Sequence, residues 1–155
     1  MAFEIERKFL VKNNKWKENI LSETVLKQGY IAHQPNATVR VRIAGDSAYL
    51  NIKSATTGIS RAEFEYAIPL ADAEAMLEKV AEQPFIHKSR YKVQWGGHVW
   101  DLDLFGGENA GLVMAEIELS SEDESFQLPP WAGEEVSADP RYYNANLVKH
   151  PFTQW

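Results

Sequence analysis

Groups of like-charged side chains, two residues apart, recur along this 155-residue chain. The acidic pairs are Glu4 and Glu6, Glu63 and Glu65, Asp101 and Asp103, and Glu116 and Glu118; the basic groups are Arg40 with Arg42, and Lys88 with Arg90 and Lys92. Residues i and i+2 of a β-strand share a face and lie roughly 7 Å apart. Clustered carboxylates favour divalent cations, and clustered Arg and Lys favour phosphate. Together the two sets indicate a site for a metal–polyphosphate complex.

An ordinary sheet with one solvated face is the alternative explanation, and it is the default for any single strand. Two features of the whole set argue against it. Like charges held this close repel each other unless opposite charge lies between them, and a solvated face usually mixes charged residues with Thr, Gln and Ser. The two signs of charge also occupy different strands. We therefore favour a barrel with a charged interior, whose apolar strand faces point outward.

Period-2 alternation identifies the strands that would position these side chains. Strands are predicted over residues 3–11, 25–33, 38–44, 48–54, 60–69, 86–95, 98–105 and 112–120. A helix is predicted over residues 71–83, where an apolar stripe ends at Pro84, and shorter helices over 15–21 and 142–149. Eight short strands with few helices predict a mainly β fold, a barrel or two packed sheets. The helices would pack outside, and the last helix could cap one mouth of a barrel.

The composition limits the class of protein. Hydrophobic residues make up 45% and charged residues 25%, which predicts one globular domain over residues 1–155. The sequence has no cysteine, so a disulfide scaffold and a thiolate zinc site are excluded, and a cytoplasmic location is expected. The N-terminus lacks the apolar core of a signal peptide, and no apolar run approaches the roughly 20 residues of a membrane helix.

The charge balance bears on partners. The formal net charge is −6, and an acidic chain is a poor general nucleic-acid binder. We expect neither a nucleic-acid nor a membrane partner, and any bound anion must meet a local basic cluster. A homodimer is compatible with the sequence, which does not fix the oligomeric state.

The ordered series of charged motifs resembles the CYTH domain family, also called the triphosphate tunnel metalloenzymes. The matching residues are, in order, Glu4, Glu6 and Lys8, then Arg40 and Arg42, Lys53, Glu63 and Glu65, Lys88 and Arg90, Asp103, and finally Glu116 and Glu118. The resemblance covers nearly the whole chain. The short bacterial members look most similar, since they share stretches such as Gln28-Gly29-Tyr30 and Arg141-Tyr142-Tyr143-Asn144.

The resemblance implies an eight-stranded antiparallel tunnel, Mg²⁺ or Mn²⁺ as cofactor, and a substrate with a linear triphosphate. The short bacterial members resemble inorganic triphosphatases, which implies hydrolysis of tripolyphosphate to pyrophosphate and phosphate. Three alternatives stay open: a class IV adenylyl cyclase, a thiamine triphosphatase, and a non-catalytic binder of polyphosphate or nucleotide.

The resemblance also implies roles for the charged residues. Glu116 and Glu118 are the first choice as metal ligands, with Glu4 and Glu6 facing them and with Glu63, Glu65 and Asp103 as the remaining carboxylates. The phosphate chain would be held by Lys8, Arg40, Arg42, Lys53, Lys88 and Arg90, because Arg binds phosphate in a bidentate manner and Lys acts as a point charge. Asp101 and Lys92 share the strand face and are predicted at the rim.

Tyr30 is a candidate general base. A tyrosine has a reference pKa of about 10, so it would need a neighbouring cation, and the activity would favour alkaline pH. Lys53 is the preferred partner and Lys8 the second. A packed core aromatic is an equally good explanation of Tyr30. Strand parity places Lys27 on the face opposite Tyr30, so both can face the lumen only if a bulge intervenes.

Overall fold

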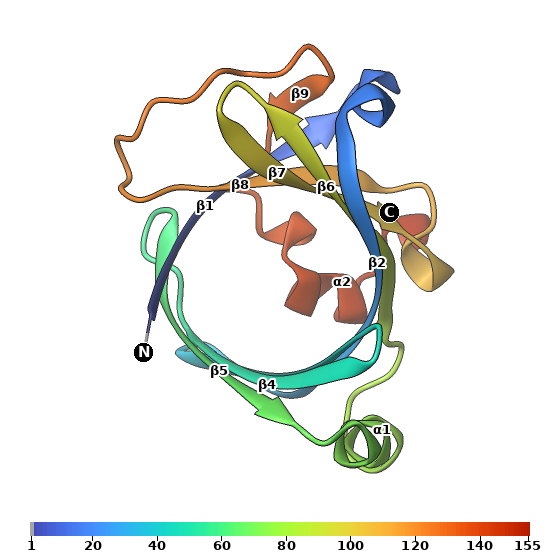
Figure 1. Ribbon diagram of the computed structural model, residues 1–155. Helices are drawn as coiled ribbons and strands as arrows, with labels where there is room; N and C mark the ends of the chain where they lie inside the picture. Colours follow the sequence, from blue (N-terminus) through green and yellow to red (C-terminus); the bar gives the residue numbers. More distant parts are fainter. Residues whose placement is uncertain (1) are drawn as a thin grey trace.

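The computed structural model describes residues 2–155, and its strands close into one antiparallel barrel (Figure 1). The ring runs β5-β4-β3-β2-β6-β7-β8-β1 and closes where β1 pairs with β5. Its strands are β1 (Ala2–Val11), β2 (Ile20–Gln34), β3 (Ala37–Ala44), β4 (Ser47–Ser54), β5 (Ser60–Ile68), β6 (Ile86–Trp95), β7 (His98–Phe105) and β8 (Val113–Glu118). The predicted barrel, rather than two packed sheets, is confirmed.

A ninth strand, β9 (Ala132–Glu135), lies in the turn-rich tail where no strand was predicted. The four residues of β9 lack an apolar alternation, so their extended form comes from pairing. One edge of β1 pairs with β5 over Ala2–Ile5, and the same strand then pairs with β9 through Phe9 and Val11. The tail thus occupies the length of β1 that β5 leaves without a partner.

Strand β2 is longer than predicted and is irregular. Its pairing with β3 shifts register between Tyr30 and Ala32, so Ile31 is an extra residue on this strand. Such a β-bulge reverses which residues face inward on its two sides.

The helices are shorter than predicted. Helix α1 (Leu70–Lys79) ends before the predicted residue 83, and the segment predicted as a helix over 15–21 is the 3-10 helix η1 (Lys15–Asn19). The last predicted helix is divided into the 3-10 turn η3 (Pro140–Tyr142) and helix α2 (Asn144–Lys149). Short 3-10 turns η2 (Gly107–Asn109) and η4 (Phe152–Gln154) complete the chain. Within residues 2–155 no helix is long and apolar enough to cross a membrane.

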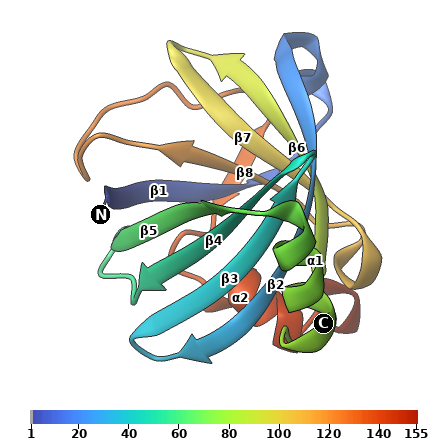
Figure 2. The same cartoon turned by 60° about the horizontal axis from the view of Figure 1, so that its bottom comes forward.

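The outward strand faces are apolar, as predicted, and two groups of residues cover them. Helix α1 packs its buried Ala73 and Leu77 against Val41 and neighbouring residues of β3 and β4 (Figure 2). On the other side, Trp100 lies within an aromatic cluster with Trp131 and Phe9. These two groups bury much of the outer apolar surface, while Phe3, Val25 and Tyr66 stay exposed, and the interior is left for polar side chains.

The C-terminal segment covers one end of the barrel, where α2 is seen within the ring in Figure 1. There the inward faces change from charged to apolar, because Leu10, Ile86, Phe105 and Met114 continue the strand faces that carry the charges. These side chains pack with Tyr142, Leu147 and Val148. This agrees with the expectation that the last helix caps one mouth.

Candidate active site

A cavity of about 680 Å³ occupies the interior of the barrel. Its lining includes Glu4, Glu6, Lys8, Tyr30, Arg40, Arg42, Lys53, Glu63, Glu65, Lys88, Arg90, Glu116 and Glu118, so every predicted site residue except Asp103 faces it. The predicted rim residues Asp101 and Lys92 also line it. The strand register explains the grouping, since it places Glu6 opposite Glu118 and Lys8 opposite Glu116 across β1 and β8.

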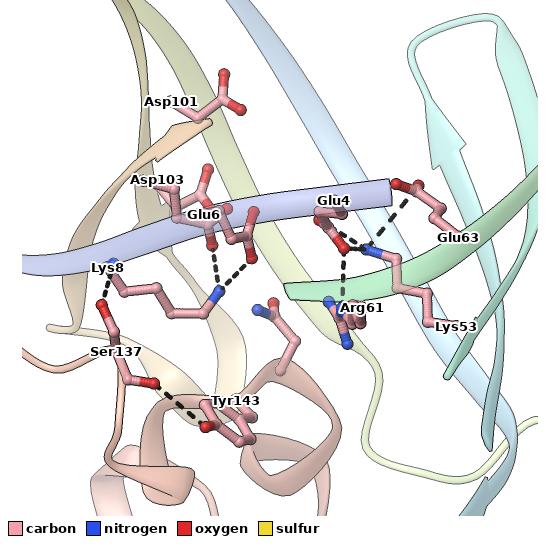
Figure 3. A network of polar contacts seen from close by, with 12 residues as sticks. Glu4, Glu6, Lys8, Lys53, Arg61, Glu63, Asp101, Asp103, Ser137 and Tyr143 are labelled. Carbon is pink, nitrogen blue, oxygen red and sulfur yellow. Dashed lines mark hydrogen bonds and ion pairs between the residues drawn. The ribbon is translucent and has the colours of Figure 1, made fainter. Parts of the chain in front are cut away.

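Lys8 joins the carboxylates of β1 and β8 (Figure 3). Its Nζ donates to Glu6 Oε1 at 2.9 Å. The same Nζ donates to Glu116 Oε1 at 2.9 Å. Burial and the adjacent Glu116 raise the pKa of Glu6 to about 7, although Lys8 opposes the shift. Burial would also raise the pKa of Glu116, but the charges of Lys8, Arg90 and Lys88 hold it well below its usual range. The pair Glu6 and Glu116 therefore lies close enough to repel, with one cation between them.

Glu4 lies between two cations on neighbouring strands (Figure 3). Lys53 Nζ donates to both Glu4 oxygens at 3.0 and 3.1 Å, and Arg61 Nε donates to Glu4 Oε2 at 2.8 Å. Burial opposes ionisation of Glu4, but Lys53 and Arg61 outweigh it and lower the pKa of Glu4 to about 2. Burial, together with Arg40 and Arg61, lowers the pKa of Lys53 to about 8.

Arg61 is a cavity residue that the sequence analysis missed. It stands two residues before Glu63, on the same face of β5 as the predicted Glu63 and Glu65. Strand parity was thus a signal for it. The pattern used for prediction was a pair of like charges two residues apart, and Arg61 is a single positive charge before two glutamates.

Asp103 lies behind the cavity lining and is completely buried. Its Oδ1 accepts from Arg90 Nε at 2.8 Å, and its Oδ2 accepts from Lys88 Nζ at 2.8 Å and from Arg90 Nη2 at 2.9 Å. Burial would raise the pKa of Asp103, but these two cations lower it. Both oxygens are engaged, so this carboxylate orients the two cations in the present arrangement.

The arginines of β3 differ in their partners. Arg42 Nε donates to Gln28 Oε1 at 2.9 Å, whereas the Nε of Arg40 is buried and has no hydrogen-bond partner within residues 2–155. Burial and the charges of Arg40 and Arg90 lower the pKa of Arg42 to about 9. Positive charge thus accumulates on this wall, which suits the binding of an anion.

Tyr30 lines the cavity and also packs in the apolar cluster near α2. Lys27 points outward, with its Nζ 5.0 Å from the centroid of the Phe85 ring. The bulge at Ile31 follows Tyr30, and it turns His33 inward as a further lining residue that strand parity had not predicted. Within residues 2–155 neither Lys8 nor Lys53 hydrogen bonds to the Tyr30 hydroxyl, so its role as a base stays a prediction.

The comparison with known families agrees with this cavity. The family model of the CYTH domain matches residues 2–150. The chain belongs to the CYTH domain family.

Two curated relatives are similar over nearly their whole length. An inorganic triphosphatase of Acetivibrio thermocellus is 48% identical over 152 residues, which cover 98% of this chain and 97% of the relative. An inorganic triphosphatase of Nitrosomonas europaea is 37% identical over 149 residues, covering 94% and 96%. A crystal structure of an inorganic triphosphatase superimposes with a TM-score of 0.70 at 35% identity, covering 96% of this chain and 95% of that one. The predicted family and tunnel fold are confirmed.

The carboxylates of this CYTH barrel suit a hard cation by their chemistry. Among residues 2–155 no three acidic or histidine side chains converge on a ready-made metal site, because the acidic side chains pair with Lys and Arg. Glu6 and Glu118 nevertheless face each other across β1 and β8, and the pKa of each is raised by burial and by neighbouring carboxylates. A divalent cation bound there would relieve that repulsion, and oxygen ligands are those that Mg²⁺ prefers.

Proposed function

We propose that this protein hydrolyses inorganic tripolyphosphate to pyrophosphate and phosphate with the help of Mg²⁺ or Mn²⁺. The observation that carries the proposal is the cavity, where basic side chains of β3, β4 and β6 and carboxylates of β1, β5 and β8 line opposite parts of the ring. A linear triphosphate is a chain of anionic groups that needs cations along its length, and its bound metal needs carboxylates. The similarity to relatives named inorganic triphosphatase supports the same substrate.

The lining favours an inorganic substrate over a nucleotide. Most of the side chains around the cavity are charged or polar, and the aromatic ones are Tyr30, His33 and Tyr143. A nucleobase would need an apolar or aromatic surface on which to stack. We therefore place class IV adenylyl cyclase and thiamine triphosphatase activities second.

The residues divide by role. We assign metal binding to Glu4, Glu6, Glu116 and Glu118, with Glu63 and Glu65 as further carboxylates, and phosphate binding to Lys8, Arg40, Arg42, Lys53, Lys88 and Arg90. A bound divalent metal supplies charge neutralisation and polarises a phosphoryl oxygen. Phosphoryl transfer depends mainly on positioning and electrostatic stabilisation, which the arginine and lysine side chains provide. We assign Asp103 to orienting Lys88 and Arg90 instead of binding the metal.

Water must attack in line with a terminal phosphorus, and a group nearby must accept its proton. Tyr30 is our candidate for that group. In the pairing of β2 with β3, Tyr30 lies opposite Arg40, so the adjacent residue on the neighbouring strand is a cation. Lys53 and Lys8 remain the cations that would assist it.

The experiment is a substrate panel. The protein is incubated with tripolyphosphate, ATP or thiamine triphosphate, with Mg²⁺, Mn²⁺ or EDTA, and released phosphate is measured, while cyclic AMP is measured for ATP. We expect tripolyphosphate to be the fastest substrate and EDTA to abolish turnover. No phosphate from tripolyphosphate, or faster turnover of ATP, would refute the proposal; tight tripolyphosphate binding without turnover would favour a binder.

A further inference from the structure

A chain of hydrogen bonds links the C-terminal helix to two cations of the cavity. Arg42 Nε donates to Gln28 Oε1 at 2.9 Å, Gln28 Nε2 donates to Asn144 Oδ1 at 3.2 Å, and Lys88 Nζ donates to the same Asn144 oxygen at 3.2 Å. Gln28 is completely buried, and Asn144 lines the cavity at the start of α2. One amide of the C-terminal segment thus contacts strands β2 and β6 together.

The donors at both ends fix how the two amides are turned. An arginine Nε–H and a lysine ammonium can only donate, so the atoms that they meet on Gln28 and Asn144 must be carbonyl oxygens. Gln28 therefore directs its NH₂ group at Asn144. The oxygen of Asn144 then receives two donors, from Gln28 and from Lys88, while its own NH₂ group donates to no acceptor within residues 2–155.

We propose that Asn144 is a substrate-binding residue whose NH₂ group donates to a phosphate oxygen, while its carbonyl oxygen and Gln28 position Lys88 and Arg42. This inference rests on the proposed function, since it concerns the same substrate. A neutral donor suits this place, because Arg42 and Lys88 already supply positive charge and Arg40 lies beside them in the wall. Gln28 is a positioning residue, because it acts on the substrate only through Arg42 and Asn144.

Substitution Asn144→Asp separates the two functions of the amide. A carboxylate keeps an oxygen for Gln28 and Lys88 but replaces the NH₂ donor by an anionic acceptor that faces phosphate. We expect the KM for tripolyphosphate to rise about tenfold to a hundredfold, the range of one hydrogen bond to a charged group, with kcat changed less. Asn144→Ala removes both functions, so kcat should fall as well. Gln28→Met should lower kcat/KM because it breaks the hydrogen bonds that hold Arg42 and Asn144.

Asn146→Asp is the matched control. Asn146 lies on the same helix and lines the cavity, and its Nδ2 donates to the carbonyl of Pro140 at 2.8 Å. It receives the same added negative charge in the cavity, so its KM reports the effect of that charge alone, and we expect a much smaller rise than in Asn144→Asp. The effects of Gln28→Met and Asn144→Ala should also be less than additive, because they break one chain of bonds.

Three results would overturn the inference: an unchanged KM in Asn144→Asp, an equal rise of KM in Asn146→Asp, or strict additivity of Gln28→Met and Asn144→Ala. If Asn144→Asp does not fold, as judged by circular dichroism, an unchanged KM in Asn144→Ala overturns it equally. A wild-type protein without turnover would refute the proposed function instead. The variants would then be compared by calorimetric Kd for tripolyphosphate with Mg²⁺, where an unweakened Asn144→Asp contradicts the inference.

Discussion

Replacing Asp103 by asparagine should destabilise the barrel strongly, because it removes the one carboxylate that both Lys88 and Arg90 contact at hydrogen-bond distance behind the cavity wall. Asparagine keeps the shape and one acceptor but loses the negative charge. Side-chain exposure is 1% for both Lys88 and Asp103. Arg90 still has Asp101 at 3.4 Å and Glu116 at 3.6 Å, but Asp103 is the one carboxylate that pairs with Lys88 among residues 2–155. Breaking a buried ion pair by removing one partner typically costs about 3–5 kcal/mol. We expect a loss of this size in the free energy of unfolding.

Urea denaturation of metal-free protein, followed by circular dichroism, measures the effect, and the melting temperature should fall by about 10 °C. Asp101→Asn is the matched control on the same strand face. Asp101 pairs with Lys92, whose side chain is 47% exposed, and lies 3.4 Å from Arg90, which keeps its shorter contacts with Asp103. Solvated pairs contribute about 1 kcal/mol or less, so we expect a smaller loss than in Asp103→Asn. If both variants lose the same small amount of stability, the ion pairs of Asp103 do not stabilise the fold and our reading of this residue is wrong.

Three further predictions concern pH, chemistry and packing. The pKa of Glu4 is lowered in the folded protein, so Glu4 stabilises the metal-free fold above about pH 5, and this stability is lost as pH falls towards 2. Glu4→Gln should remove up to about 3 kcal/mol of the free energy of unfolding at neutral pH. In urea titrations from pH 2 to 7, the free energy of unfolding of this variant should depend less on pH than that of the wild type. Tyr30→Phe should lower kcat about a hundredfold and abolish the alkaline rise in rate, whereas a tyrosine that only packs would leave kcat unchanged. Gly29→Ala should destabilise by about 1–3 kcal/mol in thermal melts, because its Cβ would lie 2.8 Å from Leu77 of α1; an unchanged melting temperature would show that α1 moves freely.

Strand alternation predicted most of this site because a closed barrel preserves the simple rule that alternate residues share a face. The rule is local, so it required no knowledge of which strands become neighbours. It succeeded even for Lys53, a single charge on its strand. It did not predict that Arg61 would share Glu4 with Lys53, since that contact depends on where β1 meets β5 at the closure of the ring.

The features that the sequence did not predict arise from tertiary structure. Strand β9 has no alternation of its own and is extended because β1 offers it a free edge. His33 faces the cavity because of a one-residue bulge, which no glycine or proline beside Ile31 signals. Asp103 has the parity of a lining residue, yet the two cations it binds lie between it and the cavity. Each outcome depends on a contact between elements that the alternation within one strand does not show.

The ion pairs that fill the barrel also determine how its ligands must arrive. Lys8 bridges Glu6 and Glu116, and Lys53 pairs with Glu4. A metal that binds these carboxylates leaves the lysines without a counter-charge. A phosphate chain that binds the lysines leaves the carboxylates without one. When metal and phosphate chain bind together, the lysines pair with phosphate and the carboxylates bind the metal. Metal and triphosphate should therefore enhance each other's binding by the same factor, as thermodynamic linkage requires.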